Sequence, residues 1–385
     1  MISKLLIANR GEIAIRIARA AADLGLQTVS VYPEDDALSL HTQVTNHSKL
    51  LKGKGAAAYM DSLQLINIAL EQGCDAVHPG YGFLSEQPAF AQLCQDYGLR
   101  FIGPAVNTLA QLGNKADARK LARRCNVPLV PGTDGDTSLD EAKAFMSTLE
   151  PDQPALLKAI AGGGGRGMRI VRDKVALETQ FQHCAAEALA AFGSGDLYIE
   201  SLLQDIRHIE VQILGDGKHI THLWDRECSL QRRHQKVVEI APSPSLDTEL
   251  RGAIINAATK MAKSVKLDSL CTFEFLVDDQ RGQFFFIEAN PRLQVEHTIT
   301  EAIAGIDIVR SQIQLANGAS LGELRLLQSD IPPPNGYAIQ LRINAETMQL
   351  DGSPRATSGT LTLLEFPGGP GIRIDKSTYT GYQIN

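Results

Sequence analysis

The sequence predicts a protein that combines α/β and α+β structure in roughly two or three domains. Short apolar runs alternate with amphipathic helical segments in the N-terminal quarter, which predicts a parallel sheet. Two Phe-rich runs on either side of residue 281 predict an antiparallel hairpin later in the chain. A length of 385 residues, of which 44% are hydrophobic, is enough to form sizeable cores.

The first predicted unit is a strand, a helix and a second strand at residues 4–8, 12–24 and 27–32. Parallel strands joined in this way take a right-handed crossover. The intervening turn reads N-R-G-E-I-A and lacks the G-x-G-x-x-G pattern, so a dinucleotide site is disfavoured here. The pattern continues with a helix near residues 62–72 and strands near 76–77 and 100–102, up to a boundary near 113–115.

A glycine-rich loop, H-P-G-Y-G-F-L-S-E, follows the strand near residue 77. Loops at the carboxyl ends of parallel strands are where such sheets bind ligands. A purely structural turn that needs positive φ at Gly80 and Gly82 explains the glycines equally well. The loop is therefore a candidate ligand loop with a structural alternative.

A second glycine-rich segment, residues 162–167, lies between two short apolar strands and follows Lys158. The pattern G-x-x-x-x-G-K-[ST] is absent, so this is not a P-loop. Backbone amides without side chains can still approach phosphate oxygens closely, and Lys158 offers a compact charge. A flexible surface linker is the alternative, but linkers rarely lie directly between two apolar strands.

The hairpin around residue 281 carries two carboxylates and an amide. If the loop is centred near Arg281, strand alternation places Glu274 opposite Glu288, with Asn290 on the same face. Ionised carboxylates among apolar strands need a compensating partner, and Mg²⁺ or Mn²⁺ prefers oxygen ligands of this kind. The alternative is an ordinary hairpin whose acidic face is solvated. The dense polar set that follows, Arg292, Gln294, Glu296 and His297, favours a site.

Several further elements complete the prediction. A strand closes at Glu200, and residues 208–214 alternate as a strand with one solvated face. If the following segment is extended, Arg232, His234 and Lys236 share one face and form an anion site, with a solvated basic face as the alternative. The remaining predictions are helices at 247–266 and 299–317, a boundary at 332–336, and strands at 337–344 and 359–366.

Composition excludes some functions. A net charge of −7 argues against general nucleic-acid binding, which favours basic domains. The cysteines show no CxxC spacing, so we expect reduced thiols in a cytoplasmic protein rather than zinc or disulfide scaffolds. The first predicted strand begins almost at once and no apolar run is long enough to span a bilayer, so we expect neither a signal peptide nor a membrane segment.

Taken together, the motifs resemble those of the biotin carboxylases, members of the ATP-grasp superfamily, over the whole chain. A single glycine loop would be weak evidence, whereas this many motifs in this order are specific. The motifs are I-A-N-R-G-E-I-A-I-R, H-P-G-Y-G-F-L-S-E, A-G-G-G-G-R-G-M-R, R-H-I-E-V-Q, C-S-L-Q-R-R-H-Q-K-V-V-E, E-A-N-P-R-L-Q-V-E-H-T-I-T-E and R-I-N-A-E.

The resemblance implies three parts and a two-step reaction. The parts are an N-terminal Rossmann-like domain with a doubly wound parallel sheet at 1–113, an ATP-grasp domain at 114–318 with a glycine-loop lid at about 131–203, and an incomplete β-rich C-terminal domain at 335–385. In the reaction, ATP phosphorylates bicarbonate to carboxyphosphate, and the released CO₂ is captured by biotin on a carrier domain. ATP and Mg²⁺ or Mn²⁺ are the implied cofactors.

The resemblance also implies roles for individual residues. Glu296 matches the base that deprotonates bicarbonate, and Arg342 the group that stabilises the biotin enolate. Arg292 and Lys236 are expected to act with them. Bicarbonate would be bound by Arg292, Gln294, Val295 and Glu296, and the metal by Glu274, Glu288 and Asn290. The positions expected to bind ATP are Lys115, Lys158, Gly163, Gly164, Gly165, Gly167, Met168, Glu200, Leu203, His208 and His234.

The implied partners are a biotin carboxyl carrier domain and a carboxyltransferase, with a homodimer expected for the full-length protein. No A-M-K-M biotin-acceptor context is present, so the carrier is expected on another chain or on a further part of this one. Two alternatives stay open. One is another ATP-grasp ligase that works through an acyl phosphate, and the other is a fragment that binds nucleotide without turnover. The final acceptor of the carboxyl group is not specified by the sequence.

Overall fold

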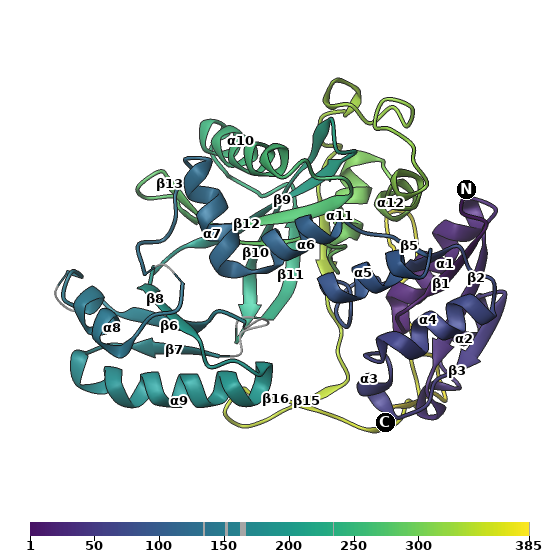
Figure 1. Cartoon of the computed structure of the whole chain (residues 1–385), viewed down its shortest axis with the longest axis horizontal. Coiled ribbons are helices and arrows are strands. Elements are labelled where there is room, and N and C mark those ends of the chain that lie inside the picture. Colours follow the sequence, from purple (N-terminus) through teal and green to yellow (C-terminus); the bar gives the residue numbers. More distant parts are fainter. Residues whose placement is uncertain (134, 151–152, 162–166, 234, 385) are drawn as a thin grey trace.

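The computed structural model describes residues 1–133, 135–150, 153–161, 167–233 and 235–384. Figure 1 shows an N-terminal α/β unit, a central unit built on a large sheet, a smaller unit formed around α9, and a C-terminal segment that returns to the N-terminal unit. The predicted combination of α/β and α+β structure is confirmed.

The N-terminal unit is a parallel sheet in the order β3-β2-β1-β4-β5. Helix α1 packs on one face with α12, and α4 and α5 lie on the other, so the sheet is doubly wound as predicted. The strands are β1 (Lys4–Ile7), β2 (Gln27–Tyr32), β3 (His47–Leu50), β4 (Ala76–His78) and β5 (Arg100–Phe101). The helices are α1 (Gly11–Asp23), η1 (Glu34–Asp36), α2 (His41–Val44), α3 (Gly55–Ala58), α4 (Ser62–Glu71) and α5 (Pro88–Asp96).

The central unit is a sheet in the order β13-β12-β9-β10-β11-β14, in which every recorded pairing is antiparallel. Helices α7 and α10 pack on its apolar face, and α11 lies against β10, β11 and β14. The strands are β9 (Arg207–Gly215), β10 (Ile220–Arg232), β11 (Gln235–Ala241), β12 (Leu270–Asp278), β13 (Gln283–Asn290) and β14 (Ala338–Leu341). The helices are α6 (Val106–Gly113), α7 (Lys115–Arg124), α10 (Thr248–Ser264), α11 (His297–Ala304), α12 (Ile308–Ala316) and η2 (Gln328–Asp330).

The smaller unit is a sheet in the order β7-β6-β8 with its own core against α8 and α9. Strands β6 and β7 are antiparallel and flank the predicted glycine loop, which confirms a hairpin at this position. The elements are α8 (Leu139–Met146), β6 (Ala155–Ala159), β7 (Met168–Val171), α9 (Lys174–Phe192) and β8 (Leu197–Ser201).

The C-terminal segment does not form the long strands that the sequence suggested. Strand β14 joins the edge of the central sheet through β11, and the predicted strand at 359–366 is only β17 (Gly359–Thr360). The remaining strands are β15 (Glu346–Met348), β16 (Pro354–Ala356) and β18 (Gln383–Ile384). The segment then contacts the N-terminal unit, where the hydroxyls of Tyr382 and Ser39 lie 2.8 Å apart.

Two further predictions are wrong, one because of a single residue and one because of how the sheet packs. The helix expected at 299–317 is split into α11 and α12, because Gly305 takes a left-handed conformation with φ +67° and ends α11. Strand β9 was expected to have one solvated face, yet Glu210 and Gln212 on that face are fully buried. The polar side chains of β9 face an internal network rather than water.

Candidate active site

The predicted carboxylate hairpin is present, and its register is confirmed. Glu274 on β12 lies opposite Glu288 on β13, and Thr272 lies opposite Asn290. An irregularity in the pairing next to Glu274 keeps these residues opposite each other. Glu274 and Asn290 are buried, with Asn290 Nδ2 donating to Glu274 Oε1 at 2.6 Å, whereas Glu288 keeps about a third of its side chain exposed.

The ammonium group of Lys236 lies at the centre of the site. Its Nζ is 2.5 Å from Glu210 Oε2, 3.0 Å from Glu274 Oε1 and 2.8 Å from Glu296 Oε1. Burial alone would lower the pKa of Lys236, but the three carboxylates outweigh it and raise the pKa well above its usual value. Lys236 therefore stays charged and holds three acidic groups from β9, β12 and the start of α11 together.

Glu296 is fully buried and is bound by one cation at each oxygen. Lys236 contacts Oε1, and Arg342 Nη2 lies 2.9 Å from Oε2. The guanidinium of Arg342 also binds Glu239 on β11 at 2.6 Å. Arg342 comes directly after β14, so the pairing of β14 with β11 brings this arginine to the site.

Arg292 lies beside the hairpin and connects it to the N-terminal unit. Its Nη2 donates to Asn290 Oδ1 at 3.0 Å and its Nη1 to Gln294 Oε1 at 3.1 Å. Its Nε lies 3.2 Å from Glu86 of the H-P-G-Y-G-F-L-S-E loop. The predicted ligand loop is thus adjacent to the residues expected to bind bicarbonate.

Glu274 has a second basic neighbour in His208, whose Nε2 lies 2.5 Å from Glu274 Oε2. Gln231 lies 3.0 Å from the other ring nitrogen of His208. Burial would raise the pKa of Glu274, but Lys236 and His208 together lower it well below its usual range. Glu274 is therefore ionised.

The side of the site nearest the smaller sheet contains Lys158 and Glu200. The ammonium of Lys158 on β6 binds the carboxylate of Glu200 on β8, and Arg119 Nη1 lies 3.4 Å from the other oxygen of Glu200. Burial alone would lower the pKa of Lys158, but the neighbouring Tyr198 and Glu200 raise it. The Glu200 side chain is thus already engaged, so nucleotide contacts here would come mainly from backbone groups.

The other residues expected to bind ATP lie at the edges of this region. Lys115 Nζ is 3.6 Å from Glu288 Oε2, which connects the two predicted sets. Gly167 is buried beside Ala159, and Met168 begins β7. Leu203 and Val295 are half-buried. Gly163, Gly164, Gly165 and His234 lie outside the described residues.

The donor set fits a hard divalent cation. Glu274, Glu288 and Asn290 offer oxygen ligands on one sheet face, and Mg²⁺ takes one or two carboxylates with phosphate and water oxygens. Two further clusters of possible metal ligands lie among the more buried residues: His208–Glu210–Glu274 and Glu210–Cys228–Glu296. The ammonium of Lys236 already contacts carboxylates in both groups, so the fit is better at the more open edge that includes Glu288.

The prediction that the basic residues between 232 and 236 share one face is wrong. Strand β10 ends at Arg232 and β11 begins at Gln235, with Arg233 at φ +50° in the turn. Arg232 binds Glu346, whereas Lys236 lies opposite Gln231 and points into the acidic cluster. The three side chains were expected to share one face of an extended segment, but Arg232 and Lys236 lie on different strands, and His234 lies outside the described residues.

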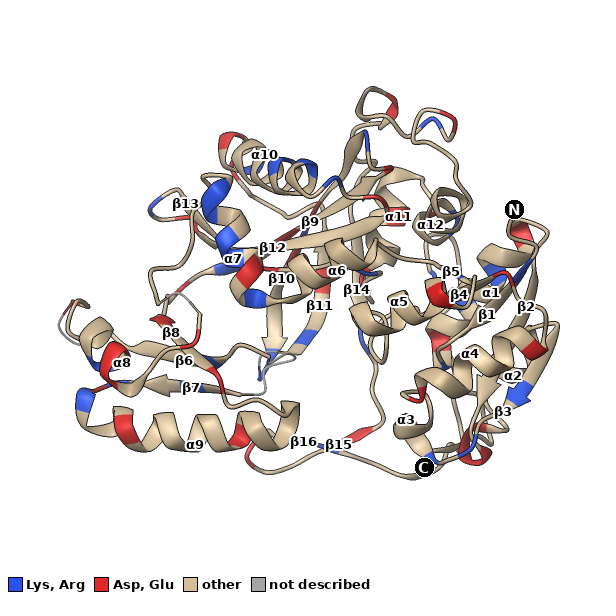
Figure 2. Ribbon diagram, in the orientation of Figure 1, with Lys and Arg blue, Asp and Glu red and all other residues tan. Residues whose placement is uncertain are grey.

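Sequence reasoning missed Glu86, Glu210, Glu239 and Arg226. Arg226 is fully buried, with Nε 2.5 Å from Glu210, and with further hydrogen bonds to Gln212, Thr272 and Thr300. Figure 2 shows acidic and basic segments intermixed along the central strands. The signal available in the sequence was the alternation of polar residues on β9, which indicated a polar face but not its burial.

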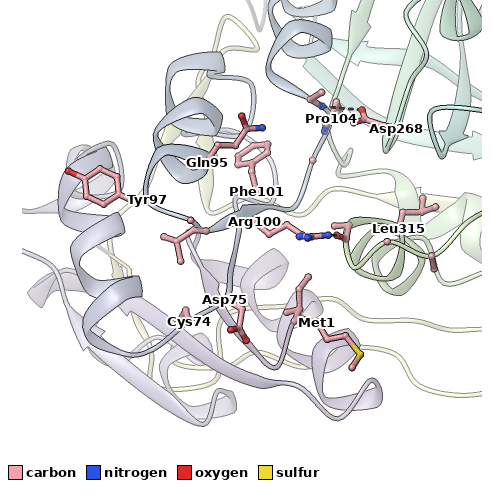
Figure 3. Close-up of a pocket in the computed structure, with 18 of the residues that line it drawn as sticks. Met1, Cys74, Asp75, Gln95, Tyr97, Arg100, Phe101, Pro104, Asp268 and Leu315 are labelled. Carbon is pink, nitrogen blue, oxygen red and sulfur yellow. Dashed lines mark hydrogen bonds between the residues drawn. The ribbon is translucent and has the colours of Figure 1, made fainter.

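A separate cavity of about 800 Å³ lies between the N-terminal unit and α12. Figure 3 shows Asp75, Arg100, Asp268 and Leu315 around it, and none of the predicted site residues lines it. Two of its charged groups are already paired: Asp75 accepts from the backbone of Ser3 and Lys4, and Arg100 donates to a backbone oxygen of α12.

A parallel α/β unit, an antiparallel sheet carrying carboxylates and a small sheet with a glycine hairpin together define an ATP-grasp enzyme. The family described as "Biotin carboxylase, N-terminal domain" matches residues 1–109, and "Carbamoyl-phosphate synthase L chain, ATP binding domain" matches residues 114–324. The chain belongs to the biotin carboxylase family, whose members are ATP-dependent ligases.

Relatives with known names agree with this assignment. The chain is 47% identical over 378 residues to the pyruvate carboxylase of Aspergillus terreus, covering 97% of this chain and 31% of that protein. It is 47% identical to the mitochondrial pyruvate carboxylase of Mus musculus, covering 98% of this chain and 32% of that protein. The chain thus spans about a third of the length of these relatives.

A solved structure provides the corresponding spatial comparison. It is the biotin carboxylase domain dimer of the 2-oxoglutarate carboxylase of Hydrogenobacter thermophilus, in complex with MgADP, ADP and bicarbonate. The two chains superpose with a TM-score of 0.95 at 42% identity, covering 100% of this chain and 83% of the other. The resemblance inferred from the motifs is confirmed.

Proposed function

We propose that this chain carboxylates biotin on a carrier domain, with ATP and bicarbonate as the other substrates and carboxyphosphate as the intermediate. The observation that carries the proposal is the position of Glu296. This buried carboxylate is held between two cations, Lys236 and Arg342, beside the oxygen-rich face of the hairpin. Relatives that bind MgADP and bicarbonate support the choice of substrates.

Glu296 acts as the base that removes the proton of bicarbonate. A general base must lie within hydrogen-bond reach of that proton, and the fork of Arg292 beside it matches a planar anion of carbonate type. The hydrogen bonds of Arg292 to Asn290 and Gln294 fix the orientation of this fork. Gln294 and the backbone near Val295 complete the bicarbonate site.

The phosphates lie between the hairpin and the smaller sheet. Lys158 and Lys115 neutralise phosphate oxygens, since phosphoryl transfer is catalysed mainly by positioning and by cations. Gly167, Met168, Leu203 and His208 line the nucleotide side. A Mg²⁺ or Mn²⁺ ion held by Glu274, Glu288 and Asn290 would neutralise further charge on the phosphates when bound.

Arg342 serves the second half of the reaction, in which N1 of biotin attacks CO₂. Negative charge develops on the ureido oxygen as N1 loses its proton, and a fixed guanidinium stabilises it. The domain boundaries predicted from the sequence, the homodimer and the carboxyltransferase partner belong to the same proposal. The relatives include both pyruvate and 2-oxoglutarate carboxylases, so the final acceptor is a separate question.

Among the described residues, each helix is too short or too polar to cross a bilayer. A cytoplasmic location belongs to the proposal alone, because the relatives include a mitochondrial protein.

The test is ATP hydrolysis by this chain with Mg²⁺, varying bicarbonate and free biotin independently. We expect hydrolysis to require bicarbonate and to rise with biotin. Hydrolysis that requires bicarbonate but ignores biotin would instead favour another ATP-grasp ligase, consistent with the name of the family matched at residues 114–324. Tight nucleotide binding without turnover would indicate a binding fragment.

A further inference from the structure

Glu239 is a buried carboxylate to which neither the motifs nor the proposed reaction assign a role. It lies on β11, is fully buried, and accepts a hydrogen bond from Arg342 Nε at 2.6 Å. The same guanidinium reaches Glu296 through Nη2. Arg342 is therefore shared between two acidic groups, one of which is the proposed base.

The other oxygen of Glu239 has no partner. Oε2 is buried and forms no hydrogen bond with any described residue. A buried ionised oxygen without a donor is costly, so a group that serves only to stabilise the fold would not be expected in this form. The carboxylate is instead suited to holding Arg342 at one edge.

The sharing of Arg342 leaves part of its guanidinium available. Glu239 Oε1 lies 2.6 Å from both Nε and Nη2, and Nη2 also donates to Glu296, whereas Nη1 has no hydrogen bond to any described residue. The Arg342 side chain keeps about a quarter of its surface exposed, so Nη1 can meet a substrate. The fixed geometry of guanidinium means that binding one edge orients the other.

We propose that Glu239 is a positioning residue: it holds the Nε edge of Arg342 so that Nη2 stays on Glu296 and Nη1 is presented to the ureido oxygen of biotin. This role rests on the proposed function of the site and adds a residue to it. Without Glu239, Glu296 would be the main anionic partner of Arg342, and the guanidinium could rotate away from the biotin acceptor.

The surroundings of Glu239 make its charge sensitive to pH near neutrality. Burial raises the pKa of Glu239 to about 7, with Arg342 opposing the shift and the carboxylates of Glu296 and Glu210 adding to it. These three charged groups come from the segment after β14, the start of α11 and β9. When Glu239 is protonated, Arg342 keeps only one anionic partner, and its position then depends on Glu296 alone.

The experiment compares Glu239→Gln with Glu227→Gln across a pH series. Glu227 is a suitable control because it is also buried and lies opposite Ile240, the neighbour of Glu239, but its ion pair is with Arg207. Two rates are measured for each protein: ATP hydrolysis with bicarbonate alone, and carboxylation of biotin. Glu239→Asp tests whether charge at a shorter reach restores part of the rate.

We expect Glu239→Gln to lower the biotin carboxylation rate about tenfold to a hundredfold and to change the KM for ATP little. The wild-type rate should show an ionisation near 7 that Glu239→Gln lacks and Glu227→Gln keeps. Glu239→Asp should recover part of the rate.

Three outcomes would overturn the positioning role. They are a wild-type carboxylation rate in Glu239→Gln, an unchanged ionisation near 7 in that variant, and equal losses in the Glu239 and Glu227 variants that follow their thermal stability. A wild-type chain that fails to carboxylate biotin would overturn the proposed function itself, which separates the two failures.

Discussion

The two faces of the central sheet differ in what holds them together. On one face, Phe273, Phe275 and Phe286 pack with α7 and α10 in a wholly apolar core. On the other, Glu210 and Arg226 are buried as ions, and Lys236 is mostly buried beside them. Burial of apolar area stabilises a fold directly, whereas a buried ion pair offsets its own desolvation at best. The apolar face therefore stabilises the fold, and the polar face contains the candidate catalytic residues.

The strongest test of this division is Glu296→Gln. If Glu296 is the base, as proposed, its loss should reduce bicarbonate-dependent ATP turnover by about 10²-fold to 10⁴-fold, the usual contribution of general base catalysis. The effect on thermal unfolding should be small by comparison, because Lys236 keeps Glu210 and Glu274 as partners and Arg342 keeps Glu239. Steady-state kinetics and calorimetry on the same preparation measure both effects. A large loss of stability with a modest loss of turnover would contradict this division of roles between the two faces.

The converse change on the apolar face is Phe275→Ala. Phe275 is fully buried between Phe284 and Phe286, so its truncation should cost about 3–5 kcal/mol of unfolding free energy. Turnover per folded molecule should stay near that of the wild type at low temperature. Denaturant titration measures the first effect and active-site titration the second. A variant that folds normally yet loses turnover would show that the two faces are coupled.

Arg226 tests whether the polar face also contributes to stability. Arg226→Met leaves Glu210 with Lys236 as its charged partner, and breaking a buried pair costs about 3–5 kcal/mol. Burial would raise the pKa of Glu210, but Arg226 and Lys236 lower it to about 2. Adding Glu210→Gln should recover part of the loss, and a double-mutant cycle measures how much. Strict additivity would mean that the pair has no net coupling.

The smallest effect at neutral pH is expected at His78, a buried group for which no described residue supplies a counter-charge. Burial, and to a lesser extent Arg16, lowers the pKa of His78 to about 3, while Nδ1 accepts from Gly80 N at 3.1 Å. The unfolded chain binds this proton near pH 6.5, so stability should fall as pH drops from 6.5 towards 3. His78→Asn keeps an acceptor and should weaken that fall, with little change at neutral pH. Chemical denaturation at several pH values measures the slope, and equal slopes in both proteins would contradict the assignment.

Local patterns predicted the parts of the site that depend on local geometry. Strand alternation and a turn near Arg281 predicted Glu274 opposite Glu288, although the observed pairing also depends on the irregularity next to Glu274. The network of Glu210, Arg226 and Lys236 depends on the order of β9, β10, β11 and β12, which no periodicity reveals. The turn at Arg233 and the left-handed Gly305 broke two predicted elements, because tight turns and helix ends depend on single residues.

The pairing of β14 with β11 also bears on how this protein could be divided into pieces. Arg342 reaches Glu296 and Glu239 only because β14 joins the central sheet, beyond the proline-rich segment that the sequence marked as a boundary. A polypeptide cut at that segment would have Glu296, the proposed base, on one piece and its guanidinium partner on the other. Split-gene complementation between the two pieces would then report strand pairing through enzyme turnover, and the sheet edge would serve as the point of reassembly.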